Sequence, residues 1–130
     1  MVINDKQFSY INQPKVNNNC IRIFHQNIRS LRNKINELLS HMFPNLPHII
    51  CLTEHHLQAQ EVGFISLDNY TIGANYCRTN SQGGGSMIYL LHGLKFTNVD
   101  LKDLCKEKDT EVCAVKINVD SKNYVCSNNI

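Results

Sequence analysis

The chain has 130 residues, of which 42% are hydrophobic and 18% charged, and its formal net charge is +2. This composition is typical of one globular domain and excludes a disordered or fibrous protein. The small positive charge does not by itself indicate a nucleic-acid-binding protein, so such a role must rest on particular residues. The longest apolar runs, such as IICL and MIYLL, are far too short to cross a bilayer, and we expect no membrane partner.

The six cysteines are widely spaced and include no C-x-x-C pair. The first ten residues are polar and lack the apolar core of a secretory signal. We therefore predict free thiols in a cytoplasmic or nuclear protein that is not secreted.

Residues 1–19 are rich in asparagine and poor in apolar residues, which predicts a flexible N-terminal tail. One folded domain is predicted over residues 20–130. It begins with CIRIFHQNI at 20–28, where Ile21 and Ile23 alternate with Arg22 and Phe24 as in a strand.

A helix and a second strand follow. Ser30 is a favourable N-cap residue, and five apolar residues after it fall at helical spacing: Leu31, Ile35, Leu38, Leu39 and Met42. Pro44 and Pro47 end this helix. HIICLTE at 48–54 has consecutive apolar residues, as in a strand covered on both faces. These elements predict a βαβ unit with two parallel strands.

The remaining strands are short and separated by turn signals at 83–85, 102–109 and 120–122. They are expected at 70–76, 86–91, 94–99, 111–119 and 123–127. Their spacing favours antiparallel pairing. The predicted fold class is therefore α/β, a partial layered α/β sandwich in which a βαβ unit precedes mostly antiparallel strands.

Two polar residues end the predicted parallel strands, Asn27 after the first and Glu54 after the second. Ligands of open α/β sheets bind outside the carboxyl ends of the strands. If the strands are neighbours, an amide oxygen and a carboxylate can converge on Mg²⁺ or Mn²⁺. The alternative from spacing alone is that Asn27 turns or caps the chain and Glu54 is a solvated strand end.

The segments FHQNIRSLRNKINEL, PHIICLTEHHL, YCR and GGGSMIYL carry a resemblance that covers residues 20–126. Together they resemble the start of the endonuclease/exonuclease/phosphatase superfamily, in particular the apurinic-type endonuclease domain of non-LTR retrotransposons. The resemblance implies a Mg²⁺- or Mn²⁺-dependent phosphodiester hydrolase that acts on DNA. It also implies that Glu54 binds the catalytic metal and that Asn27 helps to organise the site.

Later motifs of that family, G-D-x-N and S-D-H, do not occur in the sequence. We therefore expect the N-terminal fragment of such a domain, inactive alone and able to associate with itself through its incomplete sheet. A non-catalytic interaction module or a translated relic is the alternative.

The other candidate residues are assigned less directly. His55 and His56 point in different directions, so we expect a surface role or a phosphate contact rather than shared metal ligation. Cys51 and Cys77 do not complete a zinc site with them, and the glycines at 83–85 are expected to form a turn. Tyr76 and Arg78 are possible rim residues of the site.

A cationic stretch precedes the helix, comprising Arg22, Arg29, Arg32 and Lys34, with Lys15 before it. Two interpretations are equally supported, contact of this stretch with a DNA backbone and an ordinary solvated helix face.

Overall fold

The structure, a computed structural model, describes residues 20–129, so the tail predicted at 1–19 lies outside the described residues. The described chain is a mixed α/β fold in which seven strands predominate over two short α-helices.

The predicted βαβ unit is confirmed. Strand β1 (Ile23–Asn27) lies parallel to β2 (Ile49–Thr53), and helix α2 (Ile35–Met42) connects them. The next two strands, β3 (Tyr70–Tyr76) and β4 (Ser86–Leu91), extend this sheet by antiparallel pairing. Its strand order is β1-β2-β4-β3, which leaves β1 at an edge.

Three further strands form a separate antiparallel sheet in the order β5-β6-β7. They are β5 (Lys95–Val99), β6 (Val112–Val119) and β7 (Lys122–Asn129). All five strands expected after residue 69 are present, and β7 is longer than predicted. A one-turn helix, α3 (Ala59–Val62), and a 3-10 helix (Lys102–Leu104) had no signal that we recognised in the sequence.

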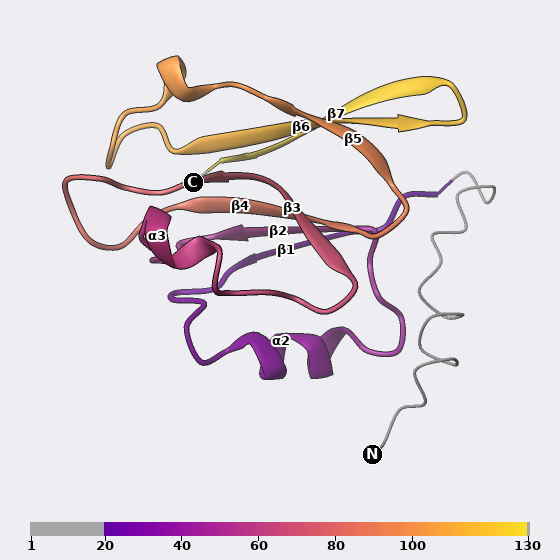
Figure 1. The fold of residues 1–130 in the computed structure, drawn as a ribbon, viewed down its shortest axis with the longest axis horizontal. Helices are drawn as coiled ribbons and strands as arrows, with labels where there is room; N and C mark the ends of the chain where they lie inside the picture. Colours follow the sequence, from indigo (N-terminus) through magenta and orange to yellow (C-terminus); the bar gives the residue numbers. More distant parts are fainter. Residues whose placement is uncertain (1–19, 130) are drawn as a thin grey trace.

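Two apolar cores lie on opposite faces of the four-stranded sheet. Figure 1 shows α2 on one side of this sheet and the three-stranded sheet on the other. On β2, Ile50 and Leu52 join the core beneath the helix, whereas Ile49 and Cys51 join the core between the sheets. Because successive strand residues point to opposite faces, both cores need apolar residues from one strand. This explains the continuous IICL run.

The prediction that Ser30 caps the helix is wrong. The helix begins at Ile35, and Ser30 has a positive φ of 80°. Residues after β1 instead bind the segment that follows β2: the Ser30 N–H donates to the Glu54 carbonyl at 2.8 Å, and the Leu31 N–H donates to the His55 carbonyl at 3.0 Å. Leu31 is fully buried although it lies outside the helix. Its helical spacing therefore reflected the core and not the secondary structure.

An apolar groove of about 600 Å³ separates the two edge strands β1 and β7. Ile21 packs into the core between the sheets, but Ile23 is 58% exposed and lines this groove. On the other side Tyr124 and Val125 are exposed, Val125 by 69%. Of the two isoleucines in the alternating pattern expected at 20–28, only Ile21 packs into a core. Ile23 stays exposed because no strand covers this edge within the described residues.

Among residues 20–129, no helix has the length and apolar character needed to span a membrane.

Candidate functional site

Asn27 and Glu54 lie at the same end of neighbouring strands. Asn27 is in register with Thr53, the residue before Glu54, in the parallel β1–β2 pair. Asn27 and Glu54 therefore end neighbouring strands at the same, carboxyl edge of the sheet. The predicted placement of the two residues at adjacent strand ends is confirmed.

The Glu54 backbone is fixed from both sides. Its N–H donates to the Gly85 carbonyl at 2.8 Å, and its carbonyl accepts from the Ser30 N–H. Glu54 has a φ of 56°, and Arg29, Ser30 and His56 around it also have positive φ. Positive φ in residues other than glycine is uncommon and concentrates at functional sites.

The side chains of Asn27 and Glu54 are accessible and form no hydrogen bond with another residue of the range 20–129. Other acidic side chains near these loops are bound by the protein, Glu61 by Arg32, and Glu111 by Arg78. An amide and a carboxylate oxygen are donors that Mg²⁺ accepts, with water completing its octahedral shell. The described residues contain no group of three or more His, Cys, Asp and Glu side chains placed to hold a metal. Asn27 and Glu54 therefore remain candidate oxygen ligands at this edge, without a cluster of further metal-ligand side chains among the described residues.

The expectation of a surface role for His55 is wrong. His55 is fully buried. Its Nδ1 accepts the Leu57 N–H at 2.9 Å, which places the proton on Nε2, and that atom donates to the Tyr76 carbonyl at 2.9 Å. Burial lowers the pKa of His55, so the ring is held neutral. His55 positions the loop that follows Glu54, whereas His56 stays partly exposed.

The glycines at 83–85 allow close packing against this loop. Gly84 and Gly85 have positive φ, and both are buried. A Cβ at Gly85 would overlap the His55 ring, and one at Gly84 would overlap Arg78 and Glu111. The predicted turn into β4 is confirmed, and its glycines are needed for space as well as for backbone conformation.

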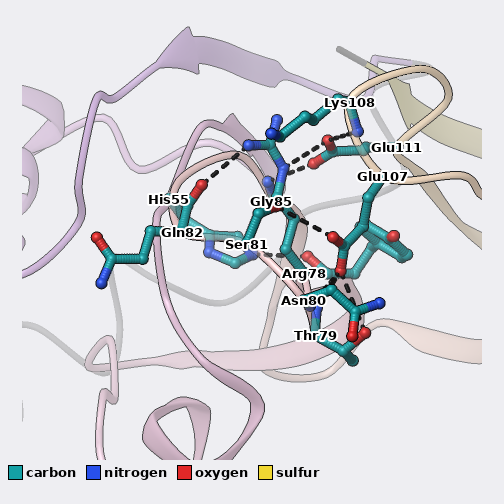
Figure 2. Close-up of polar contacts among 11 residues, drawn as sticks. His55, Arg78, Thr79, Asn80, Ser81, Gln82, Gly85, Glu107, Lys108 and Glu111 are labelled. Carbon is teal, nitrogen blue, oxygen red and sulfur yellow. Dashed lines mark hydrogen bonds and ion pairs between the residues drawn. The ribbon is translucent and has the colours of Figure 1, made fainter.

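A buried ion pair holds the segment between β3 and β4 in place (Figure 2). Arg78 Nε donates to Glu111 at 2.7 Å, and the Gly85 and Lys108 N–H groups each donate to Glu111 at 2.8 Å. Burial opposes the charge on Glu111, but these donors outweigh it and keep the pKa of Glu111 below its usual range. Arg78 is therefore a structural residue.

A second carboxylate, Glu107, holds the same segment at its tip. It accepts the Asn80 N–H at 2.8 Å and the Ser81 hydroxyl at 3.0 Å, and it also accepts the Thr79 N–H. The Asn80 hydrogen bond is the main cause of its lowered pKa. Neither Glu107 nor Glu111 was predicted from sequence. The signal that could have revealed Glu111 is a lone carboxylate directly before an apolar strand.

The four cationic residues do not form one surface. Arg22 lies before β1, at the opposite end from Asn27, and its guanidinium donates to the Leu46 carbonyl at 3.0 Å. Arg32 forms an ion pair with Glu61, which lowers the pKa of Glu61 to about 2. Lys34 Nζ donates to the Ile28 and Arg29 carbonyls at 2.8 and 2.9 Å. Arg29 is exposed and has no ion pair with another described residue.

No protein-family model matches the chain, and no curated protein matches it at a significant level.

Proposed function

We propose that residues 20–129 supply the metal-binding part of a divalent-metal-dependent DNA endonuclease domain of the retrotransposon type. The observation that supports this is the pair Asn27 and Glu54, which end adjacent parallel strands, with accessible side chains and no hydrogen-bond partner among residues 20–129. The positive φ of Glu54 and of the surrounding residues adds a second reason to look for function at this edge.

In this proposal Glu54 binds Mg²⁺ or Mn²⁺ through its carboxylate, and Asn27 orients the site with its amide. A bound metal would polarise the scissile phosphate and stabilise the leaving oxygen. Arg29, exposed in the loop after β1, is the cation best placed to meet a DNA backbone. Hydrolysis also needs a group that activates water, a contribution of about 10²–10⁴-fold. Since the family's G-D-x-N and S-D-H motifs are absent from the sequence, residues 1–130 should bind metal without cutting.

Metal binding and nicking can be tested separately. Mn²⁺ binding, followed by electron paramagnetic resonance, should show a Kd no tighter than roughly millimolar, because one carboxylate supplies the charge. Glu54→Gln should abolish it, whereas Glu37→Gln, an exposed helix residue, should not. Supercoiled plasmid with Mg²⁺ should show no nicking above background. Binding unchanged in Glu54→Gln would refute the metal site, and Glu54-dependent nicking would refute the incomplete-site proposal.

A second candidate function is a binding module that associates with itself. The observation that favours it is the groove between β1 and β7, where two strand edges that no other described strand pairs with border the exposed residues Ile23 and Val125. Such edges pair readily with another chain. Sedimentation should show concentration-dependent dimers, and Val125→Lys should reduce them. The control is Thr97→Lys on β5, at the far edge of the same sheet. A monomer at all concentrations would contradict this function.

A further inference from the structure

Two cysteines from different sheets meet in the core between the sheets. Cys51 lies on β2 and Cys126 on β7, and their Sγ atoms are 3.8 Å apart although the residues are 75 positions apart in the sequence. None of the six cysteines, all within the described range, is in a disulfide. Neither thiol has a part in the proposed metal site.

Two hydrogen bonds near the pair join β7 to the first sheet. The Asn128 amide, two residues beyond Cys126, donates to the carbonyl oxygens of Leu52 at 2.9 Å and Met87 at 3.1 Å. Side chains two apart on a strand share a face, so Asn128 and Cys126 both point to the first sheet. A disulfide needs an S–S distance of about 2.05 Å, so closure requires the sulfur atoms to approach by less than about 2 Å.

The two thiols differ in access and in acidity. Cys126 lines the apolar groove and is half-buried, whereas Cys51 is 4% exposed. The hydrogen bond between them lowers the pKa of Cys126 and, together with burial, raises the pKa of Cys51. Because Cys126 lines the groove and Cys51 is buried, Cys126 is the thiol that an oxidant reaches first.

We propose that Cys51 and Cys126 form a peroxide-sensitive thiol pair that closes into a disulfide between the two sheets. The Cys126 thiolate attacks hydrogen peroxide, the O–O bond breaks, and sulfenic acid and hydroxide form. The Cys51 sulfur then attacks the Cys126 sulfur. The S–S bond forms, the S–O bond breaks, and the hydroxyl leaves as water with the Cys51 proton. In total, two thiols and one hydrogen peroxide give one disulfide and two waters.

Closure would tie the edge strand β7 to the central strand β2. It would also change the wall of the groove, since Cys126 lines it. A peroxide-class oxidant could in this way alter the surface that the two unpaired edges present.

Peptide mapping tests the pair. The Cys77→Ser protein is the best starting point, because the tryptic peptide 35–78 then carries Cys51 as its one cysteine and the peptide 123–130 carries Cys126. Dilute hydrogen peroxide followed by digestion without reductant should yield these two peptides joined. Labelled thiols in the denatured protein should fall from five to three, and dithiothreitol should restore them.

Two variants separate a specific pair from general oxidation. Cys126→Ser should prevent the loss of labelled thiols at the same dose, whereas Cys105→Ser, a half-buried thiol elsewhere, should leave the linked peptides unchanged. If Cys126→Ser does not fold, the Cys77→Ser map decides alone. Oxidation of Cys126 without the linked peptide, or linkage of Cys126 mainly to Cys20 or Cys113, would overturn the proposal.

Discussion

Polar residues at the carboxyl edge of the first sheet fall into two groups. His55, Arg78, Glu107 and Glu111 are bound to the protein by several hydrogen bonds each. Asn27 and Glu54 are accessible and have no such partner among residues 20–129. His55 and Glu111 are buried, and a buried polar group that loses its partner costs about 1–3 kcal/mol, so their hydrogen bonds stabilise the fold. This leaves the second group as the candidates for chemistry.

Gly85→Ala should destabilise the fold strongly. A Cβ there would overlap the His55 ring, and Gly85 has a φ of 93°, which side-chain-bearing residues rarely adopt. We expect a loss of about 3 kcal/mol or more in the free energy of unfolding, measured by urea denaturation. Gly63→Ala is the control, since nothing lies within 4 Å of its added Cβ and its φ is −67°. Equal stability of the two variants would contradict the role given to His55 and Gly85.

At the level of elements, the strands were predictable because their burial follows from a simple sequence pattern. The IICL run predicted a strand covered on both faces, and β2 is such a strand. Leu31 shows where the pattern fails: core packing put an apolar residue at helical spacing, although the backbone there is not helical and its N–H donates to the His55 carbonyl. The prediction of a surface role for His55 failed for a related reason. A histidine accepting a local N–H and donating across to β3 leaves no periodic signal.

The placement of Asn27 beside Glu54 followed from topology, since adjacent parallel strands end at the same edge. The hydrogen bonds that the Glu111 carboxylate accepts could not be predicted from the sequence. Its partners Arg78 and Gly85 lie 33 and 26 positions away, and only the folded chain brings them together. The same holds for the Cys51–Cys126 pair.

Asn128 tests how β7 is attached to the first sheet. Asn128→Asp should place carboxylate oxygens against the Leu52 and Met87 carbonyl oxygens, which now accept from the amide. Burying an unpaired charge is costly, so we expect a loss of several kcal/mol at neutral pH, or protonation of the new carboxyl. Asn129→Asp, at the exposed neighbouring position, should change stability by less than about 0.5 kcal/mol. Thermal unfolding at pH 7 measures both. Similar melting temperatures would show that β7 does not depend on this contact.

For the whole molecule, two cores share one sheet, and the chain also buries two imidazole rings, His48 and His55. His48 is 1% exposed, and its Nδ1 accepts the Arg22 N–H at 3.0 Å. Burial lowers the pKa of His48 and of His55, so the folded chain keeps both rings neutral. These rings hold opposite ends of the β1–β2 pair, the first before the strands and the second after them.

Mild acid should therefore destabilise the folded protein, because the unfolded state can charge these two rings. In the unfolded chain a histidine has a pKa of about 6.5, so below that pH the unfolded state binds protons that the folded state excludes. The free energy of unfolding should fall as pH drops below about 6.5, by up to about 1.4 kcal/mol per histidine per pH unit. The pKa values of Glu61, Glu107 and Glu111 are lowered from an ordinary value of 4.5. These carboxyl groups therefore change the free energy of unfolding mainly below pH 4.5, a lower pH than the histidines need.

Urea unfolding at pH 7.0, 6.0 and 5.0 measures this loss, and replacing a buried ring should reduce it. His48→Gln or His55→Gln should lower stability at pH 7 and also flatten its dependence on pH, because the excluded proton site is gone. His25→Gln, an exposed ring on β1, should change neither. A wild-type stability that is constant between pH 7 and pH 5 would mean that both rings accept a proton in the folded state. The neutral tautomer deduced for His55 from its two hydrogen bonds would then be wrong.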